Sequence, residues 1–494
     1  MPTYSFYETQ LAVLAAFCIL AVLFERRQAA KKNEKPGGHA KSLSQAANAA
    51  ENGTTNGSLG WKRSSSASAL SRQYLIVYGI VMCADWLQGP YVYSLYREQY
   101  DLPERIVASL FVTGFLSGGL TAPIVGAWAD QHGRRRICQA FCVTYTLSCV
   151  AILFNSLPIL YTGRILGGIS TSILFSAFES WLVSSANNQG VEQSELSSIF
   201  GRATLVNGFV AFSAGIVSNK IVGTFETFAA PFIASGMLLV LGWVAIKSLW
   251  GENFGNGGGK EVYSDPFQLK RLGQAWSIVR NDPTLLTLGL TQTCFEGSMY
   301  LFVFAWVPAL QESSRPDEVL PLGYIFSAYM VSMMLGSLFY TAAASLAITP
   351  SNSPNLKASS SGNDASDNSL TLHAKLSSLV CTLGAMALAV SVTTADVRYR
   401  FWAFCLFEAC VGVYYPVQGM LRGSLISNDH RATLSSLFRV PLNVFVVTAL
   451  MTGVSSARLY VFAGCAFVLA TSAIMTGLVV VPRTENVPVT LRSA

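Results

Sequence analysis

The sequence predicts an all-α polytopic membrane protein, and composition, segment length and patterning each support this fold class. The 494 residues are 51% hydrophobic and only 12% charged, and their mean hydropathy is +0.42. Apolar stretches about 20 residues long recur along the chain, and this is the length that a helix needs to cross a hydrocarbon core. Because lipid offers no hydrogen-bond partners, such segments must satisfy their own backbone as helices. Alternating ten-residue segments typical of a membrane β-barrel do not occur.

Runs of low charge define thirteen candidate spans. The first is followed by positive charge and lacks both a basic leading region and a small-residue cleavage site, which favours a retained anchor over the alternative of a cleaved signal peptide. The other twelve form two groups of six. The spans are 6–24, 74–96, 104–128, 137–155, 157–183, 199–222, 227–248, 284–308, 321–346, 374–394, 397–421, 433–455 and 457–482.

The segments between these groups are polar and of low complexity. Two stretches are rich in Ser, Ala, Asn and Gly, so they cannot bury enough apolar surface to order themselves. We therefore expect an extra N-terminal transmembrane helix, a disordered cytosolic linker, an N-terminal six-helix half, a central cytosolic loop, a C-terminal six-helix half with a disordered insertion, and a cytosolic tail. Their expected bounds are 1–27, 28–73, 74–248, 249–283, 284–482 with the insertion 349–372, and 483–494.

The distribution of Lys and Arg predicts the orientation in the membrane. Basic residues follow the first span and fill every second loop afterwards, and such loops face the cytosol. The N-terminus is then extracytosolic and the C-terminus cytosolic, and we expect the plasma membrane. The sequons at Asn52 and Asn56 would face the cytosol and stay unmodified. The formal charge of +6 is spread over loops, so the expected environment is the lipid bilayer and no nucleic-acid partner is implied.

The sequence shows no sign of an enzyme or a metalloprotein. Ten cysteines are scattered without a CxxC pair, and the four histidines all lie in loops. Neither a nucleophile elbow nor a phosphate-binding glycine loop occurs, because the stretch GNGGGK lacks a following Ser or Thr. We expect no cofactor and no metal.

Two pairs of short strings suggest that the two groups of six arose by duplication. LSSIFGR at 196–202 precedes Asn207, and LSSLFR at 434–439 precedes Asn443. Cys83-Ala-Asp85 has a counterpart in Cys294-Phe-Glu296. Internal repeats of this kind are common in transporters.

One loop has a distinctive spacing. The stretch GAWADQHGRRR fits G-x-x-x-D-x-x-G-R-R, in which glycines allow a tight turn and the arginines hold the loop in the cytosol. This pattern resembles the signature between helices two and three of the major facilitator superfamily, which implies a fold of two six-helix halves. The alternative is a simple stop-transfer cluster of charge. The matching residues are Gly126, Asp130, Gly133, Arg134 and Arg135.

Longer strings narrow the resemblance. They look like the molybdate-anion transporter branch of that superfamily, which implies a secondary-active transporter that takes up molybdate by alternating access. The antiporter pattern of the superfamily is absent from the fifth helix, so antiport with protons is not supported by it. The strings are ADWLQGPYVYSLY at 84–96, GRILGGISTSILFSAFESWLV at 163–183, CFEGSMYLFVFAWVPAL at 294–310 and LFRVPLN at 437–443.

The resemblance further implies that helices one, four, seven and ten of the twelve line a central cavity. Each of them contains an acid, and intramembrane acids are costly enough to be functional or paired. The alternative role is an ion pair that holds helices together, and for Glu179, near the cytosolic end of its helix, a gate or capping pair. The acids are Asp85, Glu179, Glu296 and Glu408.

A molybdate site needs cationic and hydrogen-bonding groups because the ligand is a tetrahedral dianion. Arg164 lies in the fourth helix, and Arg202 and Arg439 occupy matching places in the duplicated strings, where they could contact substrate or close a gate against Glu179 and Glu408. The alternative for both is ordinary positive charge flanking a span. The polar companions are Gln88, Asn207, Tyr415, Asn443, Gln292 and Ser176.

Four acids against three arginines is an unusual balance for a dianion site. Either the acids are paired, or they are protonated and a proton travels with the substrate, which makes protons candidate co-transported ions. The same acids leave open a small organic solute or cation as substrate, and aromatic residues on the same helices fit a ring-bearing solute. A transporter-like receptor that carries nothing is the third alternative.

Overall fold

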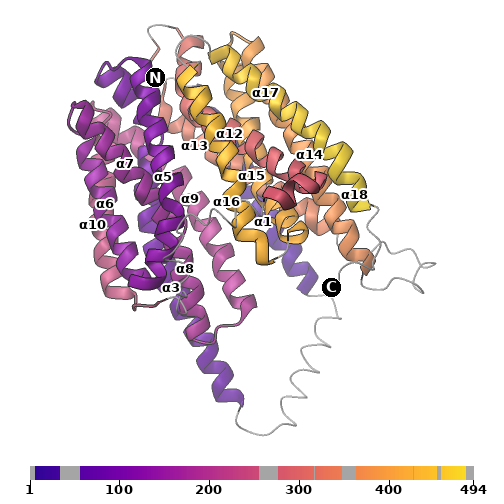
Figure 1. The fold of residues 1–494 in the computed structure, drawn as a ribbon. Coiled ribbons are helices and arrows are strands. Elements are labelled where there is room, and N and C mark those ends of the chain that lie inside the picture. The colour runs from indigo at the N-terminus through magenta and orange to yellow at the C-terminus, as the bar shows by residue number, and fades with distance from the viewer. Residues whose placement is uncertain are drawn as a thin grey trace. The chain divides into compact units, whose positions relative to one another are not determined.

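The computed structural model describes residues 6–33, 56–254, 276–315, 318–347, 363–426, 428–452 and 458–485, and within them every regular element is helical (Figure 1). The elements of the first part are α1 (Phe6–Asn33), α3 (Asn56–Gln88), α4 (Val92–Ser94), the π-helix η1 (Leu95–Gln99), α5 (Glu104–His132), α6 (Arg134–Ala151), α7 (Leu157–Leu174), α8 (Ala177–Asn188), α9 (Gln193–Phe225) and α10 (Ala230–Leu249). The later elements are α12 (Pro283–Ser313), α13 (Leu322–Ala347), α14 (Asn363–Thr393), α15 (Val397–Leu425), α16 (Asn428–Thr452), α17 (Arg458–Met475), the π-helix η3 (Thr476–Val480) and α18 (Val481–Glu485).

Each of the thirteen predicted spans falls on helical structure. Within the described residues, 11 helices are long and apolar enough to cross a membrane, and the chain is a polytopic all-α membrane protein. The two that fall short are α6, which begins with three arginines, and α16, whose apolar part is limited to Leu437–Met451. One span is broken: α7 ends at Leu174 and α8 begins at Ala177, so the fourth helix of the twelve is interrupted in its middle.

Several helix ends follow from local sequence. The side chain of Asp282 accepts the amide of Thr284 at 2.9 Å and caps α12, and Asp396 does the same for Arg398 at 2.8 Å at the start of α15. Proline inside a helix removes one backbone hydrogen bond and favours a kink. Pro308, Pro416 and Pro441 lie inside helices, in α12, α15 and α16.

The chain forms two compact units that do not coincide with the predicted halves. The N-terminal unit comprises Glu8–Val92 and Leu116–Pro266, and the C-terminal unit comprises Met1–Tyr7, Tyr93–Phe115 and Phe267–Ala494. The expected domain 74–248 is therefore not one packing unit, and aromatic contacts explain why. Tyr93 and Phe111 both meet Phe304 of α12 edge to face, with ring centroids 5.6 and 5.0 Å apart.

The two units repeat the same helix pairings. In the N-terminal unit α3 packs on α9 and α10, and α6 packs on α7 and α10; in the C-terminal unit α12 packs on α16 and α17, and α14 packs on α15 and α17. Each unit also has a stacked aromatic pair in its core, Trp181 on Trp250 at 3.8 Å and Phe295 on Tyr414 at 4.0 Å. This repetition supports the internal duplication that the short strings suggested.

Glycines set one close helix crossing in each unit. A methyl group added at Gly412 of α15 would overlap the backbone carbonyl of Met333 in α13, and one added at Gly336 would overlap that of Ala409. In the N-terminal unit a methyl group at Gly118 of α5 would lie 3.2 Å from the carbonyl oxygen of Gly168 in α7. Backbones can approach this closely only where no side chain intervenes.

Helices extend into the segments that were predicted to be disordered. Helix α1 continues to Asn33 and α3 already begins at Asn56, both inside the linker predicted for 28–73, and α14 begins at Asn363, inside the insertion predicted for 349–372. Helix α18 likewise extends the last span to Glu485, into the predicted tail 483–494. Alanine and lysine favour helix even in polar sequence, which composition alone did not weigh. The rest of these segments, with most of the loop 249–283, lies outside the described residues.

Candidate functional site

An acid, a tyrosine and an arginine lie together in the N-terminal unit. Asp85 is half-buried in α3, and its Oδ1 accepts the hydroxyl of Tyr145 in α6 at 2.6 Å. The charge of Arg164, which is half-buried in α7, acts on the same hydroxyl. Tyr145 therefore interacts with both predicted residues, with Asp85 through a hydrogen bond and with Arg164 through its charge. Sequence reasoning missed it because one tyrosine among 19 carries no signal of its own.

The polar groups predicted beside Asp85 are already satisfied within the unit. Gln88 Nε2 donates to Ser235 Oγ of α10 at 2.8 Å, and Asn207 Oδ1 of α9 accepts the indole N–H of Trp86 at 2.8 Å. Ser235 in turn donates to the backbone carbonyl of Ala84 at 2.6 Å. These bonds join α3 to α9 and α10 at the residues that flank Asp85 in α3.

The expected partnership of Arg202 with Glu179 is not found. Arg202 is exposed on α9 and its Nη1 lies 3.5 Å from Ser71 Oγ, while Glu179 is exposed at the start of α8 and its charge acts on Tyr74 and Tyr78. Glu179 lies in the first turn of α8, just after the break, within the candidate span Leu157–Asn188. The other polar companion, Ser176, donates to the carbonyl of Ser172 at this break.

The C-terminal unit brings one buried acid into the range of two arginine charges. Glu296 of α12 is 9% exposed, and its two carboxylate oxygens lie 3.3 Å from Gln292 Nε2 and 3.4 Å from the hydroxyl of Tyr414. Arg422 of α15 donates from Nη1 to Gln292 Oε1 at 3.2 Å, and the charges of both Arg422 and Arg439 act on Glu296. We call Gln292, Glu296, Tyr414, Arg422 and Arg439 the Glu296 cluster.

The Glu296 cluster bears on two expectations. Arg439 was expected either to contact substrate or to close a gate against Glu408, and its charge acts on Glu296 and Tyr300. Arg422 lies one residue beyond the predicted span 397–421, where the charge pattern predicts a cytosolic loop, yet α15 continues to Leu425 and places this guanidinium against Gln292. The signal available in the sequence was helical spacing, because Gln418 and Arg422 are four residues apart, as are Gln292 and Glu296.

Glu408 is placed differently from the other acids. It lies in the middle of α15, is 6% exposed, and makes no hydrogen bond or ion pair in the described part of the chain. The charge of Glu408 acts on Tyr329 of α13 and on Cys405 and Tyr415 of α15. Tyr415 itself is 44% exposed and contacts Met299 Sδ at 3.3 Å, and Asn443 is half-buried in α16.

Two guanidinium groups beside one carboxylate form a site suited to an anion. With Glu296 ionised the cluster keeps a net positive charge, and with Glu296 protonated the charge rises by one unit. Arginine presents its donors in a planar fork that matches oxyanion oxygens, and the Tyr414 hydroxyl adds a neutral donor. The unit thus supplies the cationic surplus that the balance of four candidate acids against three candidate arginines did not show.

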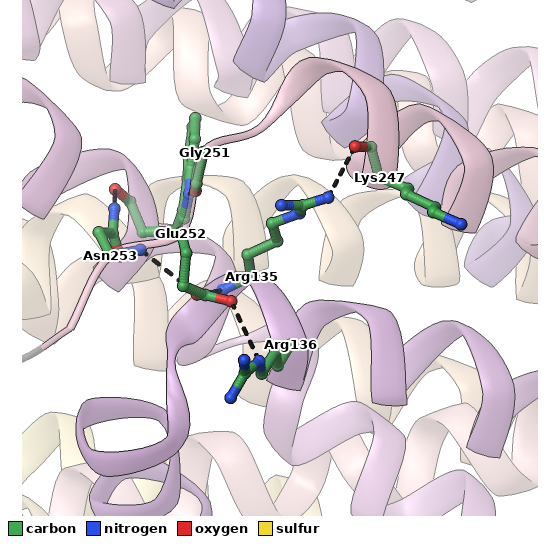
Figure 2. Close-up of polar contacts among 7 residues, drawn as sticks. Arg135, Arg136, Lys247, Gly251, Glu252 and Asn253 are labelled. Carbon is green, nitrogen blue, oxygen red and sulfur yellow. Dashed lines mark hydrogen bonds and ion pairs between the residues drawn. The ribbon is translucent and has the colours of Figure 1, made fainter.

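The signature loop is held by an acid that the sequence analysis did not single out. Gly133 has φ +100°, as the predicted tight turn requires, and it precedes the first residue of α6. Glu252, just after α10, accepts the amide of Arg135 at 2.9 Å and pairs with Arg136 at 3.8 Å (Figure 2). The carboxylate thereby caps α6 at its positive end, where Gly133 offers no side chain.

The same loop ties α6 to α8 and α10. Arg134 donates its amide to the carbonyl of Asn253 at 3.0 Å, and Arg135 Nη2 donates to the carbonyl of Lys247 at 2.7 Å (Figure 2). Asn253 is buried and donates to Ser185 Oγ of α8 at 2.8 Å. Gly126 and Asp130 lie in α5, and the placement of the Asp130 side chain is outside the described part of the structure.

Comparison with known proteins identifies the family. Residues 53–347 match the model of the family MFS_5, whose description is sugar transporters with 12 transmembrane segments. The chain belongs to this family of the major facilitator superfamily. It is therefore a secondary transporter and not an enzyme.

Curated relatives and solved structures agree with this assignment. The chain is similar to the molybdate-anion transporter of Takifugu rubripes, with 30% identity over 433 residues that cover 80% of this chain and 84% of the relative. The corresponding protein of Xenopus tropicalis is 29% identical over 76% of each chain. A nucleoside transporter structure aligns with TM-score 0.63 at 11% identity over 82% of this chain and 99% of its own, and a peptide transporter with TM-score 0.64 at 12% identity over 84% and 94%. At this identity the structures support the fold alone.

Proposed function

We propose that this protein carries molybdate across the plasma membrane by alternating access, with the Glu296 cluster as its principal anion site. Two lines of reasoning support the substrate. The relatives that match most of the chain are named molybdate-anion transporters. Independently, the cluster offers two guanidinium groups, a hydroxyl and an amide within one unit, which is the chemistry that a tetrahedral oxyanion requires.

The single observation that carries the proposal is the contact of Arg422 with Gln292 beside Glu296. Gln292 holds Arg422 through its carbonyl oxygen and Glu296 through its amide, so it orients both charged groups. In the absence of substrate the carboxylate of Glu296 partly neutralises Arg422 and Arg439. An arriving oxyanion competes with that carboxylate for the guanidinium groups, so substrate and acid exchange places as partners of the same cations.

Protons fit this scheme as co-transported ions. If Glu296 takes up a proton when the oxyanion displaces it, the site gains one positive charge at the moment it binds a dianion. Glu408 is a second candidate, because an ionised carboxylate buried without a partner is costly and its proton can move with the transport cycle. In the N-terminal unit, Asp85 and Tyr145 with Arg164 offer a third titratable group beside a cation.

A small organic solute is the second candidate substrate. The description of the matched family refers to sugars. The charge of Glu296 acts on Tyr300, Tyr414 and Tyr415, and the aromatic faces of these residues could stack on a ring of the solute. On that alternative Glu296 accepts hydroxyl groups of the solute and the arginines serve only to neutralise it.

Uptake in cells that lack their own molybdate carrier tests the substrate. We would measure cell-associated molybdenum by mass spectrometry over a range of molybdate concentrations, with an empty vector as control and surface abundance measured in parallel. Sulfate, a tetrahedral dianion of similar charge, and glucose serve as competitors. We expect saturable uptake that sulfate reduces and glucose does not.

Two arginine variants test whether the Glu296 cluster is the substrate site. Arg439→Ala should raise KM because it removes one cation of the Glu296 cluster, whereas Arg202→Ala, at the matching place in the N-terminal unit, should have a small effect. Both side chains are exposed, but the charge of Arg439 acts on Glu296, while Arg202 lies 3.5 Å from the neutral hydroxyl of Ser71. Absence of molybdate uptake by wild type at normal surface abundance would contradict the substrate, and inhibition by glucose would favour the organic solute.

A further inference from the structure

An apolar groove lies between α6 and α10 on the N-terminal unit. It has a volume of about 240 Å³, smaller than the roughly 300–1,000 Å³ of most small-molecule pockets, and it is open to the outside of the unit. Several of its residues are largely exposed: Val143 at 50%, Leu147 at 51% and Val240 at 55%. Such apolar exposure is expected where a helix faces lipid. The complete lining is Cys142, Val143, Thr146, Leu147, Leu239, Val240 and Trp243.

Basic side chains occupy the same helix faces as the groove, toward the predicted cytosolic end. On α6, Arg136 precedes Val143 by seven residues and Leu147 by eleven, spacings that return to the same face of a 3.6-residue helix. On α10, Lys247 follows Trp243 by four residues and Val240 by seven, so it too stands over the groove. At 1.5 Å per residue, the charges lie roughly 10 Å along the helices from Val143 and Val240.

The two cations are held in place but remain accessible. The side chain of Arg136 is 72% exposed, and its only recorded ion pair in the described residues is the 3.8 Å contact with Glu252. The ammonium of Lys247 lies 5.1 Å above the ring of Trp243, which itself lines the groove. The bond from Arg135 to the carbonyl of Lys247 fixes the start of α6 against the end of α10 (Figure 2).

We propose that this groove binds one anionic phospholipid, with an acyl chain along α6 and α10 and the headgroup phosphate at Arg136 and Lys247. The charge balance favours an anionic headgroup, because among the side chains that the structure describes here Arg135, Arg136 and Lys247 lie near one acid, Glu252. The roughly 10 Å between the charges and the apolar lining matches the separation of a phosphate from the upper part of its acyl chain. Anionic lipids are concentrated in the cytosolic leaflet, where the orientation predicted from charge places this end.

Lipid occupancy would reinforce the contacts of the signature loop. A phosphate at Arg136 adds an acceptor next to Glu252, at the place where the loop already joins α6 to α10. The bound lipid then acts as a structural ligand of the N-terminal unit, and it does so independently of which substrate the transporter carries.

Native mass spectrometry of the full-length purified protein tests the site. The protein is exposed to equal amounts of phosphatidylserine and phosphatidylcholine with the same acyl chains, and the retained lipid of each kind is counted. Arg136→Gln with Lys247→Gln removes the headgroup contacts, and Val143→Trp fills the groove. Lys220→Gln, which removes one exposed charge on α9 away from Arg136 and Lys247, is the matched control.

We expect wild type and the Lys220 variant to retain phosphatidylserine preferentially. Each headgroup charge contributes a factor of about 5 in affinity, so the double variant should lose about 30-fold in preference. Val143→Trp should reduce retention of both lipids. Equal retention of the two lipids by wild type, or an unchanged preference in the double variant, would overturn the proposal.

A second readout reports on the groove directly. Phosphatidylserine with brominated acyl chains should quench the emission of Trp243, and the quenching should exceed that by brominated phosphatidylcholine. The excess should disappear in Trp243→Phe. If the excess persists in that variant, the lipid binds elsewhere.

Discussion

Replacement of Arg422 by glutamine is the sharpest perturbation of the Glu296 cluster. Arg422 is half-buried, donates to Gln292 Oε1 at 3.2 Å, and acts on Glu296. A hydrogen bond that involves a charged group contributes about 1.5–3 kcal/mol, so loss of one guanidinium contact to the oxyanion should raise KM for molybdate roughly 10- to 150-fold. Uptake would be measured by mass spectrometry in carrier-deficient cells and normalised to surface abundance.

The double variant decides what Arg422 does. If Arg422 merely neutralises Glu296, then Arg422→Gln combined with Glu296→Gln leaves no uncompensated charge and should restore uptake. If Arg422 binds the anion, the double variant should remain impaired. Arg483→Gln is the control, because Arg483 belongs to the same unit and its half-exposed side chain contacts Asp282 at 2.7 Å and Thr284 Oγ1 at 3.0 Å at the start of α12. Normal KM in Arg422→Gln, or recovery in the double variant, would refute the assignment.

Three further predictions concern stability and are measured by thermal or denaturant unfolding of purified protein. Gly412→Ala should destabilise the protein by about 1–3 kcal/mol because its methyl group overlaps the carbonyl of Met333, whereas Gly419→Ala in the same helix has open space and should not; equal effects would contradict the close crossing. Glu252→Gln should cost about 1 kcal/mol through the weakened cap of α6, with exposed Glu192→Gln as the control, and no loss would mean that the cap is dispensable. Arg400→Gln should cost about 2–4 kcal/mol because this buried side chain donates to the carbonyls of Ala309, Ser391 and Thr394. Arg398→Gln, which loses an exposed cation–π contact with Phe6 at 5.2 Å, should cost no more than about 1 kcal/mol, and similar values for the two would contradict this role.

The sequence was sufficient for the helices because membrane crossing imposes a strong length and composition requirement. All thirteen predicted spans fall on helical structure. In the C-terminal unit, Gly336 and Gly412 lie at a close crossing of two of these helices. The packing units were not predictable in this way. Tyr93 and Phe111 join the C-terminal unit through Phe304, about 200 positions away, and no local pattern reveals such a contact.

The candidate site was predicted in part. Glu296 and Glu408 were found because acids are rare in apolar spans. Arg422 was missed because the positive-inside rule explained it adequately as a loop charge, and only the continuation of α15 to Leu425 brings it to Gln292. Glu252 was missed because it lies just beyond a span, where a single acid does not indicate a specific contact. The fold places its carboxylate at the start of α6.

The central claim is that the protein carries a tetrahedral oxyanion, and counterflow in proteoliposomes tests it most directly. Purified wild type is reconstituted in vesicles loaded with unlabelled molybdate, and entry of isotopically labelled molybdate is followed, with Arg439→Ala vesicles and protein-free vesicles alongside. The account predicts rapid labelled uptake by wild type, slowed by external sulfate and strongly reduced in Arg439→Ala. Labelled uptake no faster than in protein-free vesicles, while the same vesicles exchange a sugar or nucleoside, would contradict it.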